Sequence, residues 1–110
     1  MDIKKLYADL CAAIGEIPLY TFLLYADMFA RMLISKYGIG YAIGVGEYVS
    51  PGSLEDSFAV CDEYYHAAFL YIKAAVRGED TAKSEFAADK AYLTLWRKES
   101  KNKRLIREVW

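Results

Sequence analysis

The only histidine of the chain, His66, is the side chain best suited to acid–base chemistry near neutral pH. Asp62 stands four residues earlier, in the sequence DEYYHAAF, so a helix would bring the two side chains to one face. A general base also needs a nucleophile to activate, and no motif in the sequence supplies one. We therefore expect no catalytic residue and interpret His66 as a helix-surface or interface side chain.

The carboxylates and cysteines are not spaced as catalytic pairs or metal ligands. Several acidic residues stand at expected helix starts, where a negative charge complements the helix dipole. Cys11 and Cys61 lie within apolar patterns, without a Cys-x-x-Cys pair or a Cys/His spacing. We therefore expect no metal, no cofactor, and two buried free thiols of the kind found in a reducing compartment.

The glycine-rich stretch KYGIGYAIGVGEY, residues 36–48, raises the question of phosphate binding. A P-loop would end in Gly-Lys-Ser/Thr, and a dinucleotide fingerprint needs three glycines in a fixed register after a strand. The stretch has neither feature, and it follows an expected helix. Apolar residues that alternate with glycine favour a β-hairpin or an extended loop, in which glycine permits close approach of a neighbouring backbone.

Four helices are expected to position these residues. Apolar residues at helical spacing predict helices over residues 2–14, 18–36 and 61–77, and from a cap at 79–81 to about residue 98. The second helix is apolar on most sides and carries an expected surface ion pair, Asp27 with Arg31. The fold class is therefore mainly α: a four-helix bundle-like domain over residues 1–98, with an insertion at residues 38–53 between its second and third helices.

Charge is divided unevenly along the chain. Six basic and two acidic residues give positions 97–110 a net charge of +4, so residues 1–96 carry −5 of the overall −1. We expect residues 99–110 to form an extended, basic tail. Its mixture of basic and apolar residues favours docking into a groove on another protein over binding to nucleic acid. The candidate docking residues are Arg104, Leu105, Ile106, Arg107, Val109 and Trp110.

The composition of the chain indicates a single globular domain. The chain has 110 residues, of which 55% are apolar and 26% charged, values that are normal for one globular domain. Tyrosine is abundant, at 10 residues, and its apolar body with a polar tip suits half-buried interfaces. The start MDIKKLYADL lacks the pattern of a signal peptide, and no apolar run reaches the length of a membrane span. A soluble intracellular protein is the expectation.

The order of elements resembles the head-to-tail connector proteins (adaptor or neck proteins) of tailed bacteriophages. A long apolar helix is followed by a Gly/Tyr-rich insertion ending GEYVSPGS, which is similar to the Tyr-x-x-Pro exit of the insertion in such adaptors. The segment DEYYHAAFLYIKAAVRGEDTAKSEFAADKAYLTLW is similar to their helical hairpin. A free C-terminal tail completes the likeness. The glycine content of the insertion is higher than in that group.

This resemblance implies a structural virion protein without enzymatic activity. It would form a homo-oligomeric ring in the virion neck, assembled in the host cytoplasm, that joins the portal protein to tail or neck proteins. DNA would pass through without sequence-specific binding, past an acidic body that does not hold phosphates. The tail residues above would dock on the portal. A subunit interface or the lumen would be formed by Gly38, Gly40, Tyr41, Gly44, Gly46 and Tyr48.

Two other functions remain open on the sequence. A small intracellular helical regulator would bind nucleic acid or a protein partner through the same basic tail, and its DNA binding would depend steeply on salt. A small enzyme that uses His66 would lose its activity on His66→Ala. No membrane partner is expected in any of these cases.

Overall fold

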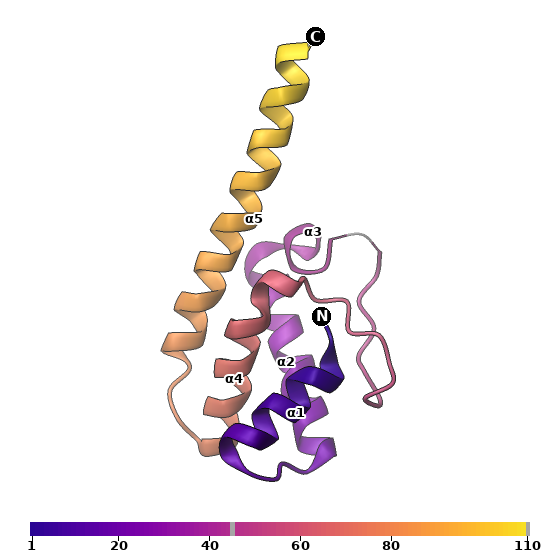
Figure 1. The fold of residues 1–110 in the computed structure, drawn as a ribbon, viewed down its shortest axis with the longest axis vertical. Coiled ribbons are helices and arrows are strands. Elements are labelled where there is room, and N and C mark those ends of the chain that lie inside the picture. The colour runs from indigo at the N-terminus through magenta and orange to yellow at the C-terminus, as the bar shows by residue number, and fades with distance from the viewer. Residues whose placement is uncertain (45, 110) are drawn as a thin grey trace.

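The protein is mainly helical, as the sequence predicts (Figure 1). A computed structural model describes the backbone of residues 1–44 and 46–109, and the side chains of residues 1–44 and 46–99. No strand occurs within these residues. The elements in chain order are α1 (Ile3–Ile14), α2 (Leu19–Tyr37), α3 (Ile39–Ala42), the 3₁₀ turn η1 (Asp62–Tyr64), α4 (Tyr65–Arg77) and α5 (Ala82–Val109).

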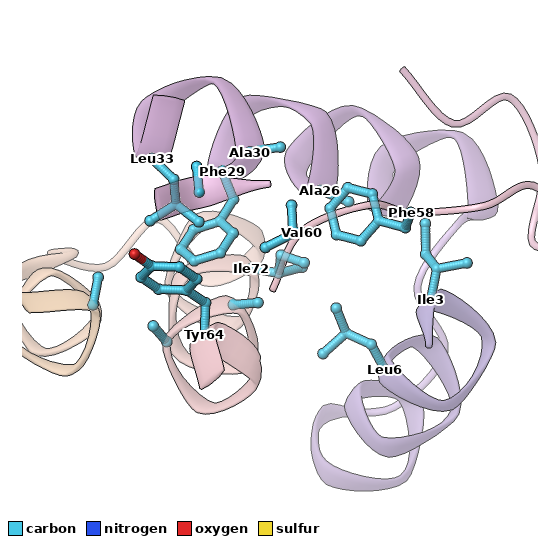
Figure 2. Packing of buried hydrophobic residues seen from close by; sticks show 14 of the residues in the cluster. Ile3, Leu6, Ala26, Phe29, Ala30, Leu33, Phe58, Val60, Tyr64 and Ile72 are labelled. Carbon is cyan, nitrogen blue, oxygen red and sulfur yellow. The ribbon is translucent and has the colours of Figure 1, made fainter. Parts of the chain in front are cut away.

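Helix α4 is the central element of the body, with α5 on one side and α1 and α2 on the other (Figure 1). The core between them is built from large apolar side chains with no exposed surface, such as Leu6, Phe29 and Ile72. Figure 2 shows Phe58 and Val60, from the long segment before η1, pointing into this core between α1 and α2. The irregular segment therefore contributes to the core of the body.

Both ends of the first helix are capped, close to the predicted bounds of residues 2–14. Asp2 caps α1, because its Oδ1 accepts a hydrogen bond of 3.1 Å from the backbone N–H of Lys5. Gly15 ends α1, and its backbone N–H donates to the carbonyl of Cys11. Asp62 begins the η1 turn that leads into α4, so α4 starts at Tyr65 and the predicted start at residue 61 is four residues too early.

The β-hairpin alternative for the insertion is wrong, because residues 39–42 form a turn of helix. Gly38 ends α2 with a φ of 86° and a ψ of 155°, a conformation open almost only to glycine. The chain then turns into α3, and the N–H of Ala42 donates to the carbonyl of Gly38 at 3.0 Å. Beyond α3 the described residues up to η1 form an irregular loop, as the extended-loop alternative expected.

The expectation of an extended C-terminal tail is also wrong, since α5 is one helix of 28 residues that continues through Val109. The segment is rich in Lys, Arg, Glu and Leu, which are strong helix formers and outweigh the polar interruption at Asn102. The second half of α5 projects beyond the body (Figure 1), and the molecule measures 54 Å along its longest axis against 28 and 23 Å across. A regular four-helix bundle is therefore not confirmed.

Candidate interaction surfaces

The loop of residues 46–60, here called the long loop, is tied to the middle of α2 by one carboxylate. Oδ1 of Asp27 accepts hydrogen bonds from the hydroxyls of Tyr48 (2.6 Å) and Ser50 (2.7 Å). Arg31 donates to Oδ2 of Asp27 at 3.0 Å, which confirms the predicted ion pair, and also to Ser50 at 2.9 Å. Partial burial alone would raise the pKa of Asp27, but the hydrogen bonds from Tyr48, Ser50 and Arg31 hold it below its ordinary value.

A groove of ≈ 260 Å³ lies between α2 and this anchored loop. Its walls include Leu23, Leu24 and Asp27 from α2 and Pro51 from the long loop. The outer side of α2 beside it is apolar and uncovered: Tyr20 is 79% exposed, and Leu24 and Met28 are each 45% exposed. These three residues, spaced at i, i+4 and i+8, lie on one side of the helix and are here called the α2 face.

A second apolar surface lies on the outer side of α5. Phe86 is 63% exposed, Leu93 45% and Trp96 47%, and these three residues are here called the α5 face. A groove of ≈ 430 Å³ between α4 and α5 adjoins it, with Phe86 in its wall. The ammonium of Lys90 lies 4.8 Å from the centre of the Phe86 ring, a cation–π contact that leaves most of the ring in solvent.

The first part of the predicted insertion packs on its own subunit. The ring of Tyr41 meets Tyr92 of α5 edge-on at 5.1 Å, and Tyr92 stacks on Tyr37 at 4.6 Å. A hydrogen bond with Glu99 raises the pKa of Tyr41 to about 12. Tyr41 was predicted to contact a neighbouring subunit or a lumen, and its side chain contacts Tyr92 and Glu99 of α5 in the same chain.

The glycines of the insertion serve backbone conformation rather than close packing within the subunit. Gly38 and Gly44 have φ values of 86° and 92°, in the region that other residues rarely adopt. A Cβ added at Gly38, Gly40, Gly44 or Gly46 would meet no atom within 4 Å. Gly38 and Gly44 therefore shape the chain on either side of α3, whereas Gly40 lies within this helix with open space beside it.

His66 and Asp62 do not form the pair that their spacing suggested. His66 lies in the wall of the groove between α4 and α5, whereas Asp62 is in η1 and lies 3.2 Å from the N-terminal amine. Cys11 and Cys61 are free thiols and are only partly buried, so the prediction of full burial is wrong. Within the described residues no group of three or more His, Cys, Asp and Glu side chains could hold a metal ion.

Five of the six predicted docking residues, all except Trp110, fall on the projecting part of α5. The backbone of residues 104–109 is helical, while their side chains and all of Trp110 lie outside the described residues. Five turns of helix span about 18 residues. Leu105, Ile106 and Val109 therefore share the helical register of Ala87, Ala88 and Ala91, which pack α5 against the body. The helix positions that pack α5 on the core are therefore occupied again, five turns later and beyond the core, by larger apolar residues.

Comparisons of the chain with protein families, with curated proteins and with solved structures found no match. Among the described residues, no single helix is apolar over the length of a bilayer. Only α1 and α2 taken together satisfy the criterion of length and composition, and they are bent by 115° relative to each other.

Sequence reasoning missed the anchor of the long loop and the α5 face. It paired Asp27 with Arg31 but not with Tyr48 and Ser50, because a contact between residues 21 positions apart depends on how the irregular loop runs. A signal for the α5 face was present. Phe86, Leu93 and Trp96 are large apolar residues on a helix whose other side has Ala88 and Ala91, and these two alanines are buried against the body.

Proposed function

We propose that this chain is a structural subunit of a head-to-tail connector, a homo-oligomeric ring that attaches to a portal protein through the projecting end of α5. The ring joins the portal to tail or neck proteins, and DNA passes through it without sequence-specific contacts. The subunit acts by binding and positioning other proteins and performs no catalysis.

The observation that carries this proposal is the shape of α5. One helix of 28 residues packs on the body by its first half and continues past it. Lys98 and Glu99 still contact the body, and the part of α5 beyond them has four basic residues and repeats the apolar register of the packed part. A helix with anchors at such spacing fits a hydrophobic groove on another protein, and the surrounding charge guides its approach to an acidic surface.

The body supplies a second line of support. Two separate apolar faces, on α2 and on α5, are exposed in the single chain, and each adjoins a groove. Exposed apolar surface of this kind marks sites of protein contact. A subunit with two such faces and a projecting arm can contact neighbours of its own kind while the arm reaches another protein.

Docking by the projecting end of α5 is tested by measuring binding to the portal protein encoded by the same genome. The chain that ends at Arg104, which lacks Leu105–Trp110, is expected to keep its melting temperature and lose portal binding. Two matched variants separate the contribution of apolar contacts to portal binding from the contribution of charge. Leu105→Ser/Ile106→Ser removes apolar anchors, and Arg104→Ser/Arg107→Ser removes the same number of charged residues.

We expect the apolar variant to abolish portal binding and the charge variant to slow association and reduce its salt dependence. A truncated chain that binds the portal as tightly as the full chain contradicts the docking role. DNA binding that falls steeply with salt and is lost only in the charge variant contradicts the proposal in favour of a nucleic-acid-binding regulator.

A further inference from the structure

We infer that copies of this chain bind one another head to tail, with the α5 face of one copy against the α2 face of the next. The inference rests on the proposed ring assembly and assigns the two surfaces that form it. The residues at its centre are Phe86, Leu93 and Trp96 on one copy and Tyr20, Leu24 and Met28 on the other.

The α5 face and the α2 face have similar apolar compositions. Each contains three large apolar side chains that are between 45% and 79% exposed, and each includes at least one aromatic ring. Phe86 stands at the edge of the groove between α4 and α5, and Tyr20 stands at the edge of the groove between α2 and the long loop. Aromatic anchors beside grooves are the usual centre of a protein interface.

The faces lie on different sides of the body, so they do not cover each other within one copy. Helix α4 lies between α5 and α1, and the long loop is on the side of the molecule away from α5 (Figure 1). Helix α2 meets α5 near its C-terminal end, where Tyr37 stacks on Tyr92 and Lys36 pairs with Asp89. A contact between two different surfaces is heterologous, and such contacts generate rings when the rotation closes.

Basic residues predominate beside the α5 face. Lys83, Lys90 and Arg97 are exposed there, and Lys83 and Lys90 line the adjoining groove. None of these three cations forms an ion pair within the part of the chain that the structure describes. Of the two carboxylates on this stretch of α5, Asp89 is held by Tyr37 and Lys36, and the exposed Glu85 is outnumbered by the three cations. Positive charge is therefore available to a partner.

The charge left unpaired beside the α2 face is acidic, because the exposed Arg31 of α2 is already paired with Asp27. Asp56 accepts hydrogen bonds from the backbone N–H groups of Gly52 (2.7 Å) and Ser53 (3.1 Å), which places its carboxylate at the rim of the α2 groove. Glu47 is exposed on the same loop. In the described residues neither carboxylate has a cationic partner, so the lysines of the next copy are complementary to them. This complementarity selects the α5 face of a second copy as the occupant of the α2 face.

The test uses two variants that each remove one face. Phe86→Ser/Leu93→Ser changes the α5 face, and Tyr20→Ser/Leu24→Ser changes the α2 face. Val76→Ser is the matched control, because Val76 is also an exposed apolar residue, at 37%, and lies outside both faces. Circular dichroism and thermal melting establish that each variant is folded, and sedimentation gives the mass of each species.

The wild-type chain and the control are expected to form species larger than the 12.5 kDa monomer, and each double variant alone is expected to remain monomeric. Equal amounts of the two variants are expected to form a complex of two chains. One variant keeps an intact α2 face and the other an intact α5 face, so a single heterologous contact is restored. An isologous interface, in which a face binds its own copy, cannot be rescued in this way.

The inference is overturned if the mixture stays monomeric, if either variant assembles as the wild type does, or if the wild type is a monomer at every concentration that solubility allows. Should a double variant not fold, Lys90→Glu tests the same contact without removing apolar surface. It is expected to weaken self-association about tenfold at low salt, and unchanged association overturns the inference. These readouts concern self-association alone, so loss of portal binding, which would contradict the proposed function, is detected separately.

Discussion

The phenol of Tyr48 donates a 2.6 Å hydrogen bond to Oδ1 of Asp27, a residue 21 positions earlier, and this contact fixes the long loop against α2. Ser50 of the same loop also binds Asp27, and the other end of the loop is held by Phe58 and Val60, whose side chains lie in the core and whose carbonyls accept hydrogen bonds from the N-terminal amine. The anchor therefore links the stability of the body to the shape of a candidate interface.

Asp27→Asn is expected to lower the free energy of unfolding by about 1–3 kcal/mol near neutral pH, because it replaces the charged acceptor of several hydrogen bonds. Urea denaturation measures the change. Glu47→Gln, on an exposed residue of the same loop, is the control and is expected to leave stability nearly unchanged.

The pH dependence of this variant has a defined sign. The pKa of Asp27 in the folded chain lies below its ordinary value of 3.8, so its charge stabilises the fold at pH values above 3.8. The advantage of the wild type over Asp27→Asn is expected to shrink as the pH falls below 3.8 and through the folded pKa. A difference that stays constant through this acid range contradicts the assignment.

Gly38→Ala is expected to destabilise the fold by about 1–3 kcal/mol, because the backbone at this position has a φ that alanine adopts only with strain. Gly40 is the matched control: it is helical, and a Cβ at either glycine has nothing within 4 Å. Gly40→Ala is expected to raise stability by up to about 1 kcal/mol. Equal effects of the two substitutions, measured by thermal melting, would show that φ is not the cause.

Tyr64→Phe is expected to leave the stability unchanged or to raise it by about 1 kcal/mol. The Tyr64 hydroxyl is buried, and among the described residues it has no hydrogen-bond partner. Its ring, beside Leu33 in Figure 2, would stay in place. The contrast is Tyr48→Phe, which removes a formed hydrogen bond and is expected to lower stability by about 1 kcal/mol. A marked loss in Tyr64→Phe would mean that its hydroxyl is satisfied.

The sequence predicts the helices well and the segments between them poorly, for physical reasons. The apolar stripe that contains Leu6 and Leu10 identifies α1, because helical periodicity is a local property. The glycines at 38, 40, 44 and 46 were interpreted as part of a β-hairpin or an extended loop, although residues Ile39–Ala42 form one turn of helix. The apolar pattern of four residues is too short to distinguish a turn of helix from a strand or an extended loop. Contacts with the rest of the fold, such as that of Tyr41 with Tyr92, favour the helix.

The candidate surfaces were only partly predictable. The basic and apolar end of the chain can be recognised from composition, but its helical form depends on continuity with the packed part of α5. The exposure of Phe86 and Tyr20 depends on which sides of α5 and α2 the body covers. That choice is made by tertiary packing, since both helices have apolar residues on more than one side.

The most direct test of the central claim is electron microscopy of purified portal rings incubated with an excess of the full chain. The account predicts an added ring of subunits on one end of the portal, and no added ring with the chain that ends at Arg104. Bare portal rings, with the full chain remaining as free 12.5 kDa monomers, would contradict it.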